Sequence, residues 1–300
     1  MSNRTRTVRL EAVKDRMGSW KSILVGLPSL YLLAFFGSAL GMMFVISLWT
    51  TQQYQLVAVW TVENYVYLLT SSSYHVLLFR SVAMAVSVTA ASLILGYPIA
   101  YYISRGMDEQ QLPVLLLFAA PFFVGAMLRE SAHQALIGAN GLASQLLGAV
   151  GIPTFGLLEY GLFQVFLGEI YLWFPFMMLS IFLSLELVDH TLLDAAIDAG
   201  ASPAVAFREV TWPLSLPGVA MGSILVFVST LVSHLPSRFI GGASGSLIGN
   251  SVKELFGAGG AWPTGAALGT ILIVISFLFV TAVVGYTFRS LPTLAMGESE

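Results

Sequence analysis

The sequence predicts an all-α integral membrane protein, a single bundle of six transmembrane helices with one helical elbow on its cytoplasmic side. Three observations carry this prediction. The 300 residues are 57% hydrophobic and 10% charged, with a mean hydropathy of +0.83, whereas about a quarter of the residues in a soluble domain are charged. Six apolar runs long enough to span a bilayer follow one another along the chain. A polar segment, residues 189–213, interrupts them and carries regularly placed helix caps.

Composition also limits the classes of function that need to be considered. The chain has no cysteine, which excludes disulfides, thiolate metal sites and cysteine nucleophiles. Its net charge is −3 and it has no dense basic patch, so we expect no nucleic-acid partner. The four histidines, at positions 75, 133, 190 and 234, are scattered without metal-ligand spacing, so we expect no metal site.

The domain organisation follows from the order of polar and apolar segments. Residues 1–21 are basic and are expected to stay in the cytoplasm, because Lys and Arg are retained on that side. The apolar run after them is too long for a signal peptide and shows no convincing cleavage site. We therefore expect one six-helix transmembrane domain over residues 22–289 and a cytoplasmic tail over residues 290–300. The six runs are 23–49, 75–103, 112–137, 158–187, 214–235 and 262–288.

The distribution of cations sets the predicted orientation. If the first helix starts inside, nine of the thirteen Lys and Arg residues fall on inner segments. Residues 50–74 contain neither Lys nor Arg and are expected outside, as are the Gly-rich residues 138–157, which have room for one short helix. Residues 236–262 form a third external segment, with a short amphipathic helix on the outer surface. Both termini and the elbow are therefore predicted to be cytoplasmic.

The elbow has the sequence features of two capped helices. Asp189 is placed to cap a short helix whose apolar residues recur at helical spacing, and Gly200 stands where a left-handed residue would end that helix. Ser202 and Pro203 have the order of an N-cap and a first-turn proline, so a second helix is expected after them.

Two interpretations of the elbow compete. It is either an ordinary cytoplasmic loop folded onto the bundle or a docking element for a cytoplasmic partner. Small residues such as Ala195, Ala196 and Ala199 allow close approach, and apolar side chains on an exposed elbow need something to bury them, so docking is favoured. The prolines at positions 213 and 217 are expected to end the second helix and restart the membrane helix.

The stretch DAAIDAGASPAVAFREVTWPLSLPG, residues 194–218, resembles the EAA loop of type I ABC importer permeases. That loop has an acidic residue, two alanines, three further residues and a glycine, and about nine residues later an aliphatic-x-Leu-Pro sequence. Two positions depart from it, because Asp stands for the usual Glu and Trp212 for the common Leu. The matching positions are Asp194, Ala195, Ala196, Gly200, Val210, Pro213 and Leu214.

The resemblance covers most of residues 75–290 and points to one subfamily. Residues 80–105, with GYPIAY at 96–101, resemble the second helix of spermidine/putrescine permeases, and residues 239–267 resemble their segment before the last helix. Where that subfamily has an Arg-Thr-Tyr-Ala-Trp-like run, this chain has Arg-Glu-Ser-Ala-His from Arg129. Glu169 stands where an aliphatic residue is expected. These departures leave the solute open between polyamines and other amine-bearing compounds.

The resemblance implies a transport subunit and not an enzyme. In the family, the elbow docks in a cleft of an ATP-binding subunit and passes the closure of two ATPase copies to the membrane helices. This chain has no G-x-x-x-x-G-K-[ST] motif, so no cofactor is expected in it, and ATP and Mg²⁺ would be used by that partner. The resemblance also implies a second related permease subunit, an extracytoplasmic solute-binding protein and the lipid bilayer of the inner membrane.

Two groups of candidate site residues result. The residues expected to contact the ATPase subunit are Asp194, Ala195, Ala196, Gly200, Ala201, Phe207 and Pro213. Those expected on the solute path are Glu130, Glu169, Tyr171 and Trp173, because charges inside a membrane are costly and aromatic rings attract amines. The second group has structural alternatives: Glu130 pairs with Arg129 or lies at the outer boundary, and the aromatic residues are core or membrane-interface residues.

Two other classes compete with a transport subunit driven by a separate ATPase. An intramembrane enzyme needs a nucleophile and a base on facing helices, but no HExxH or GxSxG motif is present, and residues 242–246 miss the latter by one position. A secondary transporter predicts internal repeats and ion-coupling carboxylates at mid-membrane. The chain shows no convincing repeat, and the elbow would then have no explanation.

Overall fold

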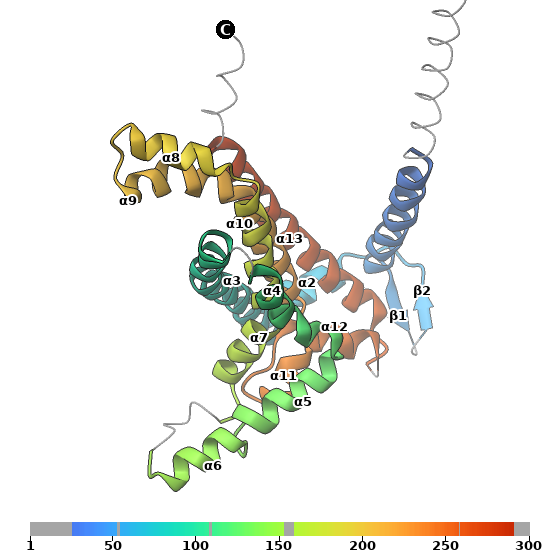
Figure 1. The fold of residues 1–300 in the computed structure, drawn as a ribbon. Coiled ribbons are helices and arrows are strands. Elements are labelled where there is room, and N and C mark those ends of the chain that lie inside the picture. The colour runs from blue at the N-terminus through green and yellow to red at the C-terminus, as the bar shows by residue number, and fades with distance from the viewer. Residues whose placement is uncertain (1–25, 53–54, 108–109, 153–158, 258, 291–300) are drawn as a thin grey trace, which may run out of the picture.

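The computed structural model describes residues 26–52, 55–107, 110–152, 159–257 and 259–290, so the basic segment 1–21 and the tail from residue 291 lie outside it. Apart from one small hairpin, its regular elements are helices (Figure 1). Among the described residues, five helices are long and apolar enough to cross a membrane, and the number is six if one bent pair of helices counts as a single span. The predicted helical membrane fold is confirmed. The five spans are Gly26–Ser47, α3 (Ser72–Gly106), α7 (Leu162–Glu186), Pro203–Leu231 and α13 (Trp262–Ser290).

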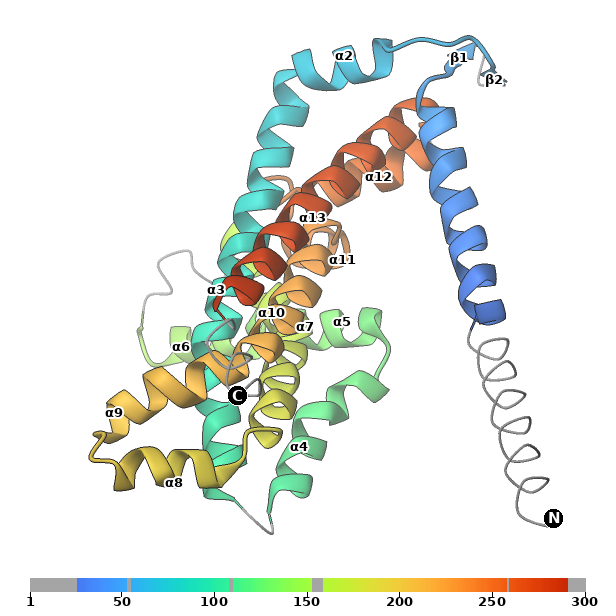
Figure 2. The same cartoon turned by 90° about the horizontal axis from the view of Figure 1, so that it is seen from above.

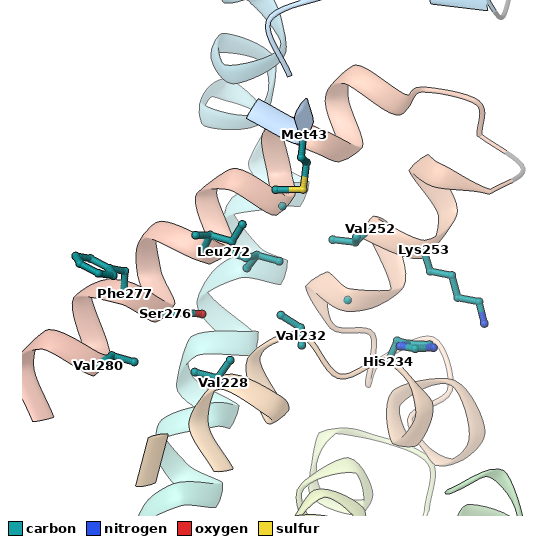
Figure 3. Close-up of a pocket in the computed structure, with 13 residues that line it drawn as sticks. Met43, Val228, Val232, His234, Val252, Lys253, Leu272, Ser276, Phe277 and Val280 are labelled. Carbon is teal, nitrogen blue, oxygen red and sulfur yellow. The ribbon is translucent and has the colours of Figure 1, made fainter. Parts of the chain in front are cut away.

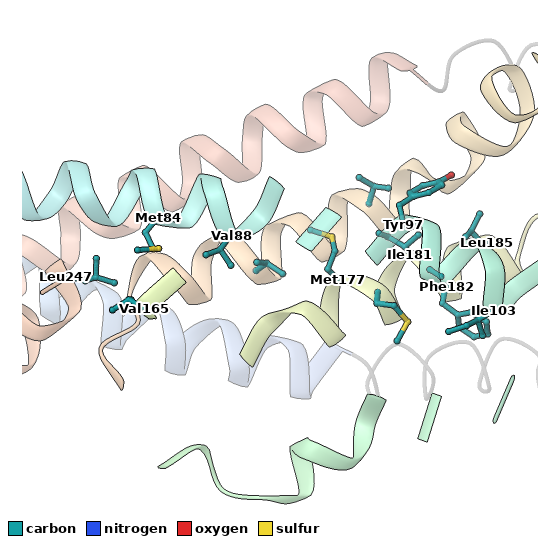
Figure 4. Packing of buried hydrophobic residues seen from close by; sticks show 14 of the residues in the cluster. Met84, Val88, Tyr97, Ile103, Val165, Met177, Ile181, Phe182, Leu185 and Leu247 are labelled. Atoms are coloured by element: carbon teal, nitrogen blue, oxygen red, sulfur yellow. The ribbon is translucent and has the colours of Figure 1, made fainter. Parts of the chain in front are cut away.

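Helices α3, α7 and α10 (Trp212–Leu231) form the centre of the bundle. They lie side by side in both views of the fold (Figures 1 and 2). Their shared faces bury long apolar side chains, among which Val88, Met177 and Ile181 are completely buried (Figure 4). Lipid chains are as apolar as these residues, so close packing holds the helices together more than exclusion from the solvent does.

The α7–α10 contact is closest at two glycines of α10. A Cβ atom built on Gly218 would collide with the backbone oxygen of Ser180, and one on Gly222 would lie 2.7 Å from Sδ of Met177. The Ser180 oxygen belongs to the backbone, so it cannot move away without separating the two helices. Small residues at such crossings let membrane helices pack backbone against backbone.

We expect Gly218→Ala to destabilise the folded protein by roughly 1–3 kcal/mol, because the added methyl group overpacks the α7–α10 crossing. Fluorescence-detected size-exclusion chromatography after heating measures this as a lower melting temperature. Gly285→Ala in α13 is the matched control, because a Cβ atom there meets nothing within 4 Å. Equal melting temperatures for the two variants would contradict the close approach.

Helix α13 is joined to the bundle by a second apolar cluster. The ring of Phe227 in α10 stacks on that of Phe279 in α13, with 3.7 Å between the centroids. The predicted amphipathic helix of the third external segment is present as α12 (Ile248–Phe256). It does not lie only on the outer surface, because Ile248 is completely buried and its backbone N–H donates to Oγ of Ser81 at 2.8 Å. A further short helix, α11 (Leu235–Ile240), precedes it.

The N-terminal helix Gly26–Ser47 stands apart from the bundle along most of its length (Figure 2). It is joined to the rest of the protein at its last turn, where Asn64 donates to the backbone oxygens of Ser47 and Trp49 at 2.9 and 2.8 Å. Asn64 also accepts a hydrogen bond from Thr264 of α13 at 3.0 Å. One amide side chain therefore connects the first and last membrane helices.

The polar segment predicted for residues 50–74 contains regular structure that its composition does not indicate. Strands β1 (Thr50–Gln52) and β2 (Gln55–Val57) pair antiparallel, and α2 (Glu63–Thr70) follows them. Strand β1 contacts α13, so the hairpin is supported by tertiary contacts. Isolated hairpins are marginal in water, which explains why local sequence alone does not reveal this one.

The sequence predicts a single helix for the third apolar run, residues 112–137, and this prediction is wrong. Helix α4 (Gln111–Ala119) and the 3-10 turn η1 (Ala120–Phe123) form one half, and α5 (Ala126–Ile137) with α6 (Leu142–Ala149) forms the other. The two halves are bent by 101°. The helix ends here because the proline of η1 has no backbone N–H and the residue after η1 is extended, at φ −98° and ψ 132°.

Candidate functional site

The predicted elbow is present, and its caps are the ones the sequence indicates. The side chain of Asp189 accepts a hydrogen bond of 2.9 Å from a backbone N–H in the first turn of α8 (His190–Asp198). Gly200 turns the chain with a φ of +93°. Ser202 caps α9 (Pro203–Ala206) by accepting a 3.4 Å hydrogen bond from a backbone N–H. The two helices project together from one end of the bundle (Figure 1).

The prediction that the prolines at 213 and 217 end the second elbow helix is wrong. The chain stays helical from Pro203 to Leu231, and α9 passes through a π-turn, η2 (Phe207–Thr211), into α10. Pro213, which is partly buried, has no N–H for the carbonyl four residues earlier. The wider π-turn before it accommodates the ring without a break. The elbow is therefore a direct extension of a membrane helix.

The outward surface of the elbow combines small and apolar side chains. Leu192, Ile197 and Val205 are 49%, 45% and 48% exposed. Exposed aliphatic side chains next to alanines suit a surface that another protein covers. The predicted partner-binding residues on α8 and the turn after it are exposed or partly exposed: Asp194, Ala195, Ala196, Gly200 and Ala201.

Phe207 packs against the membrane helices. Its half-buried ring lies edge-to-face on Tyr97 and Tyr101 of α3, with 5.7 Å between centroids in each pair. Tyr97 also contacts Trp212, at 5.3 Å between centroids, and its hydroxyl hydrogen-bonds Oγ of Ser215 at 2.8 Å. We call Tyr97, Tyr101, Phe207 and Trp212 the aromatic clasp. Through it the elbow is attached to α3 as well as to α10.

Polar contacts hold the chain where it enters the elbow. Oγ of Ser104 donates to Oε1 of Glu186 at 2.7 Å, and Nη2 of Arg105 donates to the backbone oxygen of Val188 at 3.4 Å. These bonds join the last turn of α3 to the end of α7, immediately before α8. Helix α3 therefore restrains the elbow both before α8, through these hydrogen bonds, and after α9, through the aromatic clasp.

The two predicted intramembrane carboxylates come together from α5 and α7. Glu130 and Glu169 are both 0% exposed. A Cβ atom on Gly168 would lie 3.5 Å from Oε2 of Glu130, which places that carboxylate against α7 next to Glu169. Oε2 of Glu169 accepts a 2.9 Å hydrogen bond from Nε1 of Trp173, and Ser233 lies against the same carboxylate. Both oxygens of Glu130 and Oε1 of Glu169 have no hydrogen-bond partner.

Neither oxygen of Glu130 has a hydrogen-bond partner, so Arg129 forms no hydrogen bond to it. Its guanidinium carbon lies 5.1 Å from the centroid of the Phe122 ring, and its Nε and Nη1 atoms have no hydrogen-bond partner. Tyr171 is 39% exposed, and its ring lies 6.0 Å from that of His133. Of the two predicted aromatic residues, Trp173 is therefore the one that contacts the carboxylate pair.

A cavity of about 350 Å³ lies beside Glu169, between α5, α7 and the end of α10. Trp173 and Ser233, the two side chains against Glu169, both line it, and so does Arg129. The bend in the third apolar run brings α5 to this place. The rest of the lining is formed by Ala126, Leu172, Ser229, Val232, His234 and Leu235.

A second cavity, of about 640 Å³, separates the N-terminal helix from α10, α12 and α13 (Figure 3). Met43, Val228, Leu272 and Phe277 belong to its mostly apolar lining, which also includes Lys253. No carboxylate is among the residues that line this cavity, and the same is true of the cavity between α5, α7 and α10. Within the described residues, no group of three His, Asp or Glu is placed to hold a metal ion.

Several residues of these sites are not apparent from the sequence. Ser215 and Ser233 gain their roles from neighbours on other helices, and no local pattern marks them. Two residues of the aromatic clasp carry a signal: Tyr97 lies in the GYPIAY sequence, and Trp212 replaces the leucine that is common at this position of the EAA pattern.

Two curated proteins show the family. The chain is 32% identical over 223 residues to the spermidine/putrescine transport system permease protein PotB of Escherichia coli, a match that covers 74% of this chain and 81% of PotB. It is 34% identical over 239 residues to the inner membrane ABC transporter permease protein YdcU of Escherichia coli, covering 74% of this chain and 75% of YdcU. No family model matches the chain.

A solved structure has a similar fold. It belongs to a bacterial ABC transporter involved in the import of the acidic polysaccharide alginate, and it matches with a TM-score of 0.64 over 94% of this chain and 99% of that chain. The two sequences are 14% identical, so this likeness supports the fold alone. The identity to PotB and YdcU shows that the chain belongs to the family of ABC transporter permeases, the multi-pass transport subunits of the inner membrane.

Proposed function

We propose that this chain is the permease subunit of an importer for polyamines of the spermidine and putrescine type. The observation that carries the proposal is the 32% identity to PotB across 81% of that protein. Glu130 and Glu169 support it and are proposed to lie on the solute path with Tyr171 and Trp173, because buried carboxylates suit a cationic solute. Another amine-bearing organic solute is the second candidate, favoured by the departures at Glu130 and Glu169 from the polyamine permease pattern.

The elbow is proposed to dock on a separate ATP-binding subunit. Its alanines, its exposed aliphatic side chains and its rigid capped turn support this role. Two copies of the ATPase would hydrolyse ATP with Mg²⁺, because this chain has no phosphate-binding loop, and the chain itself is proposed to hold no cofactor. The proposed contact residues are Asp194, Ala195, Ala196, Gly200 and Ala201.

The movement that accompanies closure of the two ATPase subunits would be transmitted to the membrane helices along two connections. One route is the continuous helix from Pro203 to Leu231, which includes Pro213. The other is the aromatic clasp, through which Phe207 connects the π-turn to α3. Because Phe207 packs on α3, we assign it to the transmission of movement and not to direct contact with the ATPase. Rocking of α3 and α10 together would alternate access between the two sides of the membrane.

A second permease subunit, related to this one, would complete the solute path. A solute-binding protein outside the inner membrane would deliver the amine. Both termini and the elbow would face the cytoplasm, because most Lys and Arg residues lie on segments of that side. Protease protection of tags at the two termini in sealed inverted vesicles tests this orientation.

Transport by the reconstituted complex tests the cargo. The complex, purified through a tag on this chain and placed in proteoliposomes with its binding protein, is expected to accumulate radiolabelled spermidine or putrescine only when ATP is present. Excess unlabelled spermidine should compete, whereas glutamate, an anionic solute, should not. Uptake of a different amine that spermidine does not inhibit would favour the second candidate, and uptake of no amine at all would refute both.

A further inference from the structure

The π-turn η2 determines which side of its helix carries the rings of Phe207 and Trp212. We propose that Pro213 is a positioning residue for the coupling of the elbow to α3, because it keeps the chain in the π-turn that places both rings on Tyr97. The inference rests on the proposed function, in which the elbow passes movement to α3. It adds the residue that sets the direction in which the elbow leaves α10.

The two rings stand five residues apart in the chain but contact the same side chain. The ring centroid of Tyr97 lies 5.7 Å from that of Phe207 and 5.3 Å from that of Trp212. Each residue of an α-helix turns the chain by about 100°, so side chains five residues apart point about 140° away from each other. A regular α-helix could therefore present only one of the two rings to Tyr97.

The π-turn removes this difference in direction. The backbone N–H of Trp212 donates to the carbonyl oxygen of Phe207, five residues earlier, so this turn contains one residue more than a turn of α-helix. Its two ends lie one above the other, as residues i and i+4 do in an α-helix. Arg208 and Glu209, inside the turn, are exposed, so the additional residue does not disturb the side that packs on α3.

Pro213 disfavours the α-helical alternative. An α-helical turn would need an N–H at position 213 that donates to the carbonyl oxygen of Glu209. Proline has no N–H, and its ring would collide with that oxygen, at a cost of roughly 3 kcal/mol. A proline alone does not produce a π-turn, because Pro217 stands inside the same helix without one before it. The second requirement is the contact of both rings with Tyr97, which only position 213 has next to it.

Pro213→Ala restores the N–H and is expected to release the π-turn. An α-helical turn in its place would rotate α9 by about 100° about the helix axis and take Phe207 off Tyr97. In proteoliposomes that contain the whole importer complex, the ratio of ATP hydrolysed to amine transported should rise at least about fivefold. The melting temperature should stay the same or rise, because the helix gains a hydrogen bond. Pro217→Ala is the matched control and should couple like the wild type.

Deletion of Glu209 from the Pro213→Ala variant should restore coupling. Phe207 and Trp212 then stand four residues apart, on one side of a regular α-helix, and both rings can contact Tyr97 again. A substitution that only weakened the fold would not be repaired by the removal of a further residue. Glu209→Ala keeps the number of residues and should not rescue Pro213→Ala.

A distance measurement tests the same geometry without reference to the cargo. The chain has no cysteine, so Ala204→Cys in α9 and Ile94→Cys in α3, both at exposed positions, accept spin labels selectively in this subunit. Pulsed electron paramagnetic resonance should show a narrow distance distribution with Pro213, a shifted or broader one in Pro213→Ala, and the original one after the deletion.

Unchanged distances and an unchanged ratio in Pro213→Ala, or no recovery after the deletion, would overturn the role of Pro213. If the wild-type complex transports no amine, the proposed cargo is wrong, and the distances still decide whether Pro213 holds the π-turn. If the wild type transports amines while the distances do not respond, the proposed function stands and this inference falls.

Discussion

Replacing Gly200 by valine is expected to abolish transport. Gly200 has a φ of +93°, a conformation that costs a β-branched residue on the order of 1–3 kcal/mol. A Cβ atom at this position meets nothing within 4 Å, so the effect comes from the backbone and not from a clash. The turn between α8 and α9 would relax to another conformation, and the proposed docking surface would change shape. We expect the amount of co-purified ATPase subunit to fall at least about tenfold and ATP-dependent uptake to reach background.

Two further variants separate the turn from other effects. Gly285→Val is the matched control, because its Cβ atom also meets nothing within 4 Å but its backbone is that of the regular helix α13. It should retain both the ATPase and uptake. Ala195→Trp adds bulk to an exposed position of α8 without changing the turn, and it should also lose the ATPase. If Gly200→Val keeps the ATPase subunit and transports normally, the docking assignment is wrong.

Phe207→Ala is expected to separate ATP hydrolysis from transport. The ring of Phe207 contacts Tyr97 and Tyr101 of α3, whereas the proposed docking residues lie on α8 and the turn after it. The ATPase subunit should therefore still bind and hydrolyse ATP, while movement of the elbow no longer reaches α3. The ratio of ATP hydrolysed to amine transported in proteoliposomes should rise by roughly 5- to 150-fold, which corresponds to a coupling free energy of roughly 1–3 kcal/mol.

Conservative variants show whether the ring acts through coupling. Phe207→Leu restores part of the apolar contact and should restore part of the transport. Tyr97→Phe removes only the hydrogen bond to Ser215, a loss of about 1 kcal/mol, and should have a smaller effect. Phe288→Ala deletes a ring that is 72% exposed on α13 and should change nothing. If hydrolysis and uptake fall in equal proportion in Phe207→Ala, the ring does not serve coupling.

The membrane fold and the elbow were predictable because both depend on local physics. An apolar run of bilayer length has to become helical, since its backbone N–H and C=O groups find no other partners in lipid. Caps also act over a few residues, so Asp189, Gly200 and Ser202 mark the ends of the elbow helices without reference to the rest of the chain. The EAA pattern spans the same short segment, and this is why it identified the family.

The prolines at 121 and 213 show that residue type alone does not predict where a helix ends. Pro121 ends a helix and starts a bend of 101°, whereas Pro213 stands inside a helix that continues to Leu231. The residue type is the same, and the difference lies in the packing around it. Phe207 and Trp212, just before Pro213, are held against α3 by the aromatic clasp, so the chain keeps its helical path and a π-turn takes up the missing hydrogen bond.

The sequence alone determined that this chain is a membrane permease with a capped elbow, and it marked Glu130 and Glu169 as costly charges inside the membrane. The tertiary structure decided that these two carboxylates lie together and that Phe207 faces α3. It also decided that Trp173 and Ser233, which contact Glu169, line a cavity. The physical reason is that spacing along the chain specifies which residues share a face of one helix. It does not specify which helices meet, and here the bend before α5 and the glycines of α10 decide that.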